Sequence, residues 1–460
     1  MPNALASLAL VIYPAVVVWL FVRLPRGRAL LASLILGYLF LPPAPAGFDF
    51  PLMPPLTKQT IPGLAALFTC LVMFRGELRF LPENNTARAL VLLFIFSPFG
   101  TVLTNMDPVH FGGFTLPALQ LREAVAQCIN QALLMSPMLL ARNFLRTDDD
   151  IRDLLWAMLL AGLVYSLPML LEVRLSPQLN IWIYGYFQHS FEQMIRGDGF
   201  RPIVFLYHGL WAAFLAMTGV LSAITIARSD HSRRALLWWA MAGYMALVLI
   251  LCKSLASLLY AAAFAPVLIF LSSRMQFRVA MLLACLVLAY PVIKTLNIIP
   301  EAEILAYAET IDEDRANSLR FRLDNENILL ERAMERPVFG WGSWGRNQIY
   351  DGTTGEIMTT TDGRWIITIG VYGWAGFLAE FGLLTLPILL VWWRASQVGR
   401  DIPPWVGGAV LILAINVIDM VPNATLTPMS WLFAGALLGY SEQIETVRRG
   451  RRVARLRTVL

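Results

Sequence analysis

Long apolar runs are the feature that most limits how this chain can fold. They recur from one end of the sequence to the other, and many approach the roughly 20 residues that a helix needs to cross a bilayer. Only 15% of the 460 residues are charged, whereas soluble domains carry about a quarter. Because lipid offers no partner to backbone polar groups, such runs cross a membrane as α helices. The sequence therefore predicts an all-α polytopic membrane protein.

The expected spans lie near residues 4–22, 29–42, 61–75, 88–104, 120–140, 154–172, 203–227, 235–252, 255–272, 277–294, 365–391, 404–420 and 424–440. This gives about 12 or 13 transmembrane helices, of which the short second and third could be tilted or re-entrant. The first run lacks a preceding basic segment and a small-residue cleavage site. We therefore interpret it as a span and not as a signal peptide.

Arginine-rich loops set the expected orientation. They lie near residues 23–28, 75–88, 142–152, 228–234, 274–278 and 394–400, and the C-terminal tail is also basic. Such loops face the cytoplasm in most membrane proteins, which turns 43–60, 105–119, 173–202 and 295–364 outward and places the N-terminus outside. The expected units are an N-terminal bundle (1–294), a large outer loop (295–364), C-terminal helices (365–440) and the tail (441–460).

Several charged and sulfur-containing groups have simple interpretations. The net charge of +5 reflects topology and does not indicate a nucleic-acid partner. The tail is either a topology signal or a site for lipid headgroups or a partner protein. The four cysteines have no CxxC spacing and read as small buried apolar residues. The run Asp148–Asp150, flanked by Arg146 and Arg152, favours a solvated loop over a metal site.

The outer loop begins with an acidic stretch and continues with a helical pattern. The acidic residues are Glu301, Glu303, Glu309, Asp312, Glu313 and Asp314, of which the cluster 312–314 is only a weak metal candidate. We expect the helix to start near Asn317 or Ser318 and to stop before Pro337. The alternative is an amphipathic helix that lies on the membrane surface.

This helix carries two pairs of opposite charge at i,i+4 spacing. Arg320 precedes Asp324, and Arg322 precedes Glu326, by four residues each. Such neighbours lie on one helix face, so we expect both pairs to form ion pairs along it.

The segment Phe339–Arg346, FGWGSWGR, matches the GxGxxG pattern. No strand precedes it and no helix follows it in a βαβ unit, so a dinucleotide site is rejected. We expect instead a turn whose amides approach an anion, with Arg346 at a phosphate and Trp341 and Trp344 against sugar faces. The alternative is that the tryptophans anchor the loop at the membrane interface.

A second outward segment, RGDGFRPIVFLYHG from residue 196, runs into a long span. Arg201 would stand at the outer start of that helix with His208 about two turns inside. The alternatives are a snorkelling arginine and a packed histidine. Glu380, Asp419 and Lys253 fall at membrane depth, where an ionisable residue is either functional or hydrogen-bonded inside the bundle.

These segments, with RFRLDNENILLERAMERPVFGWGSWGRN (320–347) and DGRWIITIGVYGWAGF (362–377), resemble the O-antigen ligase and polymerase superfamily. Its members are bacterial inner-membrane glycosyltransferases that use undecaprenyl-diphosphate-linked glycans. The resemblance covers about residues 196–392 and implies a GT-C-like fold whose outer loop closes over the site. It implies that the donor diphosphate is bound by arginines, and that tryptophans contact the glycan. The arginines are Arg201, Arg320, Arg322 and Arg346, and the tryptophans are Trp341, Trp344 and Trp365.

The chemistry agrees with this resemblance. A lipid diphosphate is a good leaving group that needs cationic groups to stabilise its developing charge. A carboxylate, Asp362 or Glu326, would take the proton of the acceptor hydroxyl, and His208 is a further candidate. The mechanism demands no metal ion and no cofactor.

The leading hypothesis is a polymerase of an exopolysaccharide or surface glycan in the bacterial inner membrane, acting at the periplasmic face. Ligases of the superfamily carry a histidine near the end of the large loop, whereas no histidine follows His231 here, so a ligase is the second hypothesis. The third is a transporter of lipid-linked oligosaccharide, although transporters place polar groups at the midplane between internal repeats. Expected partners are the lipid-linked oligosaccharide, the bilayer and other polysaccharide assembly proteins.

Overall fold

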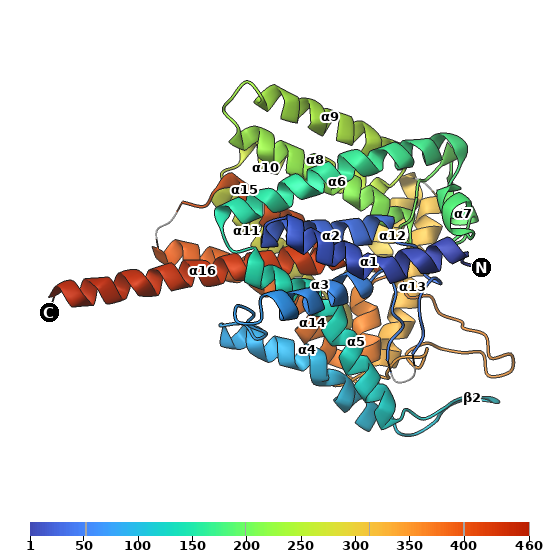
Figure 1. Cartoon of the computed structure of the whole chain (residues 1–460). Helices are drawn as coiled ribbons and strands as arrows, with labels where there is room; N and C mark the ends of the chain where they lie inside the picture. Colours follow the sequence, from blue (N-terminus) through green and yellow to red (C-terminus); the bar gives the residue numbers. More distant parts are fainter. Residues whose placement is uncertain (51–52, 198, 312, 399–400, 460) are drawn as a thin grey trace.

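Helices dominate the structure, which is a computed structural model (Figure 1). It describes residues 1–460 except 51–52, 198, 312, 399–400 and 460, and it does not describe the side chains of Ile311, Asp314, Arg315, Val398 or residues 449–459. Part of the acidic stretch and the tail arginines beyond Arg448 therefore lie outside the described residues. Sixteen α helices and two short β hairpins form the described part, which confirms the all-α expectation.

Most helices run along one common axis. They are α1 (Ala4–Arg23), α2 (Arg26–Phe40), α3 (Ile61–Met73), α4 (Asn85–Leu103), α5 (Leu121–Phe144), α6 (Asp148–Leu175), α8 (Gly209–Ser229), α9 (Ala235–Leu251), α10 (Leu255–Phe270), α11 (Ser273–Thr295), α14 (Arg364–Val398), α15 (Pro404–Asp419) and α16 (Pro428–Val459). The short α7 (Leu179–Tyr184), α12 (Glu301–Ile311), α13 (Glu313–Met334) and the hairpins β1–β2 (Val109–Phe111, Phe114–Leu116) and β3–β4 (Ile195–Arg196, Gly199–Phe200) gather at one end. We call this the loop end, and the opposite end, where α16 projects, the tail end (Figure 1).

Every expected span coincides with a helix. Seven helices are long and apolar enough to cross a membrane on their own: α1, α4, α5, α6, α8, α11 and α14. The apolar helices α3, α9, α10 and α15 are shorter. The chain is thus a helical polytopic protein with about seven candidate spans among its described residues. The larger count of 12 or 13, the division into four units and the orientation remain predictions.

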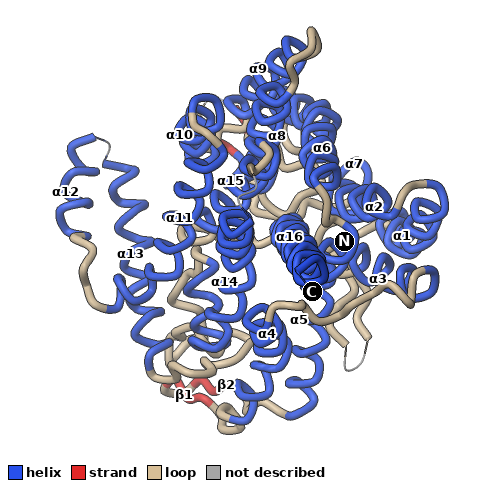
Figure 2. The backbone as a smooth tube through the Cα atoms, turned by 90° about the vertical axis from the view of Figure 1, so that its left-hand side faces the viewer, coloured by secondary structure: helices blue, strands red, loops and turns tan. Residues whose placement is uncertain are grey.

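The bundle is centred on helices with small residues at their contacts. Helix α8 packs against α6, α9, α10 and α15, and most of it is buried. Helix α16 packs closely against α5. A Cβ at Gly435 would lie only 2.7 Å from the Met138 Cα, so the close contact depends on glycine at this position. Seen along the axis, α12 and α13 project sideways beside α11 (Figure 2).

Helix α14 is folded back on itself. Arg364 and Glu380 form a two-pronged ion pair, with Nε–Oε1 and Nη2–Oε2 distances of 2.7 and 2.5 Å. Sixteen residues of straight helix would separate them by about 24 Å. The chain reverses at Gly373, whose φ of 65° and ψ of −164° are outside the helical region. The prediction of one continuous span over 365–391 is therefore wrong.

The outer-loop helix also differs from expectation. Helix α13 stops before Pro337 as predicted, but it begins at Glu313 and not near Asn317. Its arginines pair with other segments instead of with i,i+4 neighbours, because α12 and the chain before α14 bring carboxylates closer. Arg320 pairs with Glu309 of α12, and the Arg322 Nε lies 3.4 Å from the Asp362 Oδ2.

Candidate anion-binding site

Cationic side chains from separate segments gather at the loop end. Arg201, which follows the β3–β4 hairpin, donates from Nη2 to the Lys253 carbonyl at 3.1 Å. Lys253 in turn donates from Nζ to the Arg196 carbonyl at 2.8 Å. Lys253 was expected at membrane depth, but it occupies the turn between α9 and α10 with a φ of +50°. The α9–α10 turn is thus hydrogen-bonded both to the β3–β4 hairpin and to Arg201, which lies between that hairpin and α8.

Arg322 of α13 reaches the same group. Burial is the main cause that lowers the pKa of His208 to about 3, and the charges of Arg201, Arg196 and Arg322 lower it further. The pKa of Arg201, lowered to about 10 mainly by burial, also falls because of Arg322. Arg201 and Arg322, 121 positions apart in sequence, therefore lie in one electrostatic neighbourhood. We call Arg196, Arg201, His208, Lys253 and Arg322 the cationic site.

Arg201 is held ready for a negative charge. Its side chain is 7% exposed, and its Nε is buried without a hydrogen-bond partner. No carboxylate among the described residues forms an ion pair with it. Its stem lies on Gly209, where a Cβ would come within 2.6 Å of the Arg201 Cγ. A buried cation with an unused donor is costly unless an anion pairs with it.

His208 caps helix α8 and does not lie two turns inside it. Its Nδ1 accepts the Leu210 N–H at 3.0 Å. The low pKa keeps the ring neutral at pH 7, so the proton sits on Nε2. A neutral ring with its acceptor nitrogen in use can donate a hydrogen bond but cannot act as a base. His208 therefore fits an anion-binding role and not the predicted proton-accepting one.

The two candidate carboxylates have different surroundings. Asp362 is 39% exposed and lies against Arg322. Glu326 accepts from the Trp365 Nε1 at 2.7 Å and the Tyr290 Oη at 3.0 Å, and it pairs with Lys294. Burial raises the pKa of Glu326, while Lys294 counteracts this rise. Glu326 joins α11, α13 and α14, which leaves Asp362 as the carboxylate beside the cationic site.

Two predicted diphosphate ligands lie elsewhere. Arg346 is 1% exposed, and its guanidinium donates to the carbonyls of Pro117 at 2.6 Å and Asp107 at 2.9 Å. Its Nε donates to a third carbonyl, that of Trp341, at 3.1 Å. Arg346 thus fastens the 105–119 segment and has no accessible donor for a ligand. Arg320 is occupied by Glu309 on the surface of the α12–α13 pair.

The tryptophans and glycines of the turn mostly serve packing. Trp341 is 6% exposed beneath the Arg332 guanidinium, 3.3 Å from its ring centre, and Trp365 is fully buried. Trp344 alone of the three predicted glycan contacts is well exposed, at 70%. The three glycines of the turn have positive φ. However, the amides of Trp341 and Gly342 donate to carbonyls of α14 and are not free for an anion.

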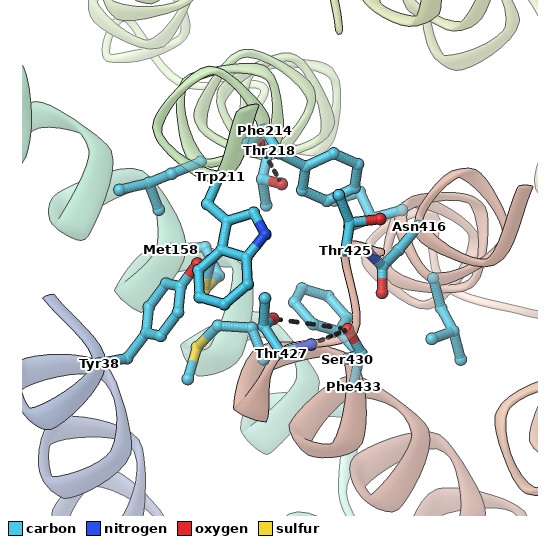
Figure 3. Close-up of a pocket in the computed structure, with 14 residues that line it drawn as sticks. Tyr38, Met158, Trp211, Phe214, Thr218, Asn416, Thr425, Thr427, Ser430 and Phe433 are labelled. Atoms are coloured by element: carbon cyan, nitrogen blue, oxygen red, sulfur yellow. Dashed lines mark hydrogen bonds between the residues drawn. The ribbon is translucent and has the colours of Figure 1, made fainter. Parts of the chain in front are cut away.

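An uncharged cavity adjoins the cationic site (Figure 3). Trp211, one turn after His208, points its indole nitrogen into this cavity, and Tyr38 of α2 stacks on it with ring centres 6.2 Å apart. Asn416 of α15 contributes a buried Oδ1 without a partner. Tyr207, 5.9 Å from Trp211 between ring centres, connects the cavity to the site. No sequence pattern predicted this cavity, since its lining comes from five helices.

A wider cleft opens at the tail end. It is lined by aromatic and charged residues of α2, α6, α8, α9 and α15, including Trp156, Trp238, Trp405, Arg28 and Asp230. Helices α2, α6, α8 and α15 line both this cleft and the uncharged cavity. Both hollows therefore lie along the same four helices.

Comparison with known proteins adds no relative. No protein-family model matches the sequence, and no curated protein matches it significantly. The fold and the site define a helical polytopic membrane protein with a cationic site at its loop end. The resemblance to the O-antigen ligase and polymerase superfamily remains a prediction.

Proposed function

We propose that the protein is a glycosyltransferase that joins undecaprenyl-diphosphate-linked repeat units into a polymer. In this proposal the loop end faces the periplasm of a bacterial inner membrane. The observation that carries it is the gathering of Arg196, Lys253 and Arg322 around the buried Arg201 guanidinium, which forms no ion pair with a carboxylate among the described residues. Such a site suits a multiply charged anion such as a diphosphate.

The cationic site fits the leaving group of this reaction. The bond from the donor sugar's anomeric carbon to the diphosphate oxygen breaks, and the acceptor hydroxyl oxygen bonds to that carbon. Arg201 and Arg322 stabilise the negative charge that develops on the diphosphate, and the His208 Nε2–H donates to it. Asp362, paired with Arg322, takes the acceptor proton.

The test compares three arginines. Arg201→Ala and Arg322→Ala should abolish chain growth when purified protein is incubated with a lipid-linked repeat unit and the products are sized. Arg320→Ala is the matched control, because Arg320 lies on the same helix but pairs with Glu309 at the surface. It should give polymer of normal length. Full-length polymer from Arg201→Ala and Arg322→Ala would overturn the proposal.

A carrier of lipid-linked oligosaccharide is the second candidate. It is supported by the tail-end cleft and the uncharged cavity, which lie along the same helices α2, α6, α8 and α15. Transport between two faces needs hollows that open toward each. Flipping of a labelled lipid-linked sugar in liposomes, without chain growth, would favour the carrier over the polymerase.

A further inference from the structure

A strained segment joins Arg201 to His208. Val204 has a φ of +53°, which is unfavourable for a β-branched residue. Residues 203–206 are all buried, so water does not satisfy their backbone groups. Strain of this kind persists only where the surroundings impose it, and it concentrates at functional sites.

Glu172, near the loop end of α6, is the main support of this segment. Its Oε2 accepts the N–H groups of Ile203 at 2.8 Å and Val204 at 2.7 Å. Its Oε1 accepts the Leu179 N–H at 3.1 Å. The side chain is only 1% exposed, and no cation among the described residues pairs with it. The buried Glu172 carboxylate thus accepts hydrogen bonds from the backbone segment that links Arg201 to His208.

Three more side chains complete the support. Lys58, from the segment between α2 and α3, donates from Nζ to the Phe205 carbonyl at 2.6 Å. The Phe205 N–H donates to the Tyr165 Oη at 3.0 Å. Gln188 donates to the carbonyls on both sides of Phe205, each at 2.9 Å. Four side chains from three separate segments, α6 and the chain at Lys58 and Gln188, therefore converge on residues 203–206.

A buried lysine such as Lys58 is unusual where the contact has a structural role alone. It is 5% exposed and has no ion-pair partner among the described residues. An apolar side chain at such a place commonly costs less than a buried charge. The presence of Lys58 and Glu172 is explained if the backbone of residues 203–206 must be held in place to position Arg201 and His208.

We propose that Glu172 and Lys58 are positioning residues that fix Arg201 and His208 for binding a lipid diphosphate. Arg201 lies two residues before the supported segment 203–206, and His208 lies two residues after it. A shift of the segment therefore moves the guanidinium and the α8 cap together. The ligand class named here rests on the proposed function.

The experiment compares the binding of undecaprenyl diphosphate with that of uncharged undecaprenol by the full chain in detergent. The wild type should prefer the diphosphate. Glu172→Gln and Lys58→Met should each reduce this preference roughly tenfold, about the effect of one charge-assisted hydrogen bond. Binding of undecaprenol should stay unchanged, and Glu172→Ala should be worse than Glu172→Gln, which keeps one accepting oxygen.

Glu442→Gln is the matched control. Glu442 is equally buried at 1% exposure, but it pairs with Arg142 on α5, far from the site in sequence and on other helices. Its loss should lower the unfolding temperature and leave the preference for diphosphate intact. An unchanged preference in Glu172→Gln and Lys58→Met would overturn the positioning role. A wild type without any preference would instead refute the proposed function itself.

Discussion

Gly209 offers a sharp test of the cationic site, because the Arg201 side chain packs directly against it. An added Cβ at Gly209 would come within 2.6 Å of the Arg201 Cγ, closer still to Cδ, and 3.2 Å from the Pro202 carbonyl oxygen. Neither the stem of a buried arginine nor the backbone can yield easily. We expect Gly209→Ala to displace the guanidinium.

The size of the effect follows from two opposing terms. Alanine is favoured over glycine in a helix by about 1 kcal/mol, so α8 should form at least as well. A displaced guanidinium loses a charge-assisted hydrogen bond to the diphosphate, about 1.5–3 kcal/mol. The variant should therefore fold normally but bind undecaprenyl diphosphate roughly 10- to 150-fold more weakly.

Isothermal titration calorimetry in detergent, together with the thermal unfolding midpoint, separates these terms. Gly219→Ala is the control on the same helix, because a Cβ there meets only the flexible end of Met245 at 3.0 Å. It should bind as the wild type does. If Gly209→Ala bound the diphosphate within twofold of the wild type, Arg201 would not be the anion ligand that its geometry indicates.

Three further predictions concern structural roles. Arg346→Ala should loosen the 105–119 segment, because the Pro117 and Asp107 carbonyls lose their donor; faster proteolysis there is the readout, and unchanged cleavage would contradict it. Glu380→Gln should destabilise the fold by about 3 kcal/mol in thermal unfolding, since it leaves the largely buried Arg364 without its ion-pair partner, whereas a wild-type midpoint would refute the fold-back of α14. Trp344→Gly should keep or raise the midpoint, because Trp344 is exposed and has a φ of +66°, and a clear fall would show that its ring is packed.

The helices were predictable because hydropathy is a local property. Each apolar run corresponds to a helix, and Pro337 ends α13 as its missing N–H requires. A turn through Gly340, Gly342 and Gly345 also followed from the glycine spacing, and all three residues have positive φ. The fold-back at Gly373 did not, since three spaced glycines in an apolar run equally indicate close packing of one straight helix.

The site was predictable only in part, because an arginine's sequence context does not reveal its partners. Arg201 and Arg322 were placed at one site from their segments, and the structure brings them together. Arg346 looked equivalent but satisfies backbone carbonyls of a segment more than 200 positions away in sequence. Lys253 was assigned to membrane depth although it lies between the expected spans 235–252 and 255–272, and the structure places it in the turn between α9 and α10.

The double attachment of the chain around residues 343–363 has a mechanical consequence. Before it, the amides of Trp341 and Gly342 bond to α14, and after it Arg364 is locked to Glu380 of the same helix. This stretch is therefore a closed ring with a common anchor, and it cannot swing open about a single hinge. The neighbouring pair α12 and α13 is fastened differently, through Lys294 of α11, which pairs with Glu301 and Glu326, and through the hydrogen bond from Trp365 of α14 to Glu326.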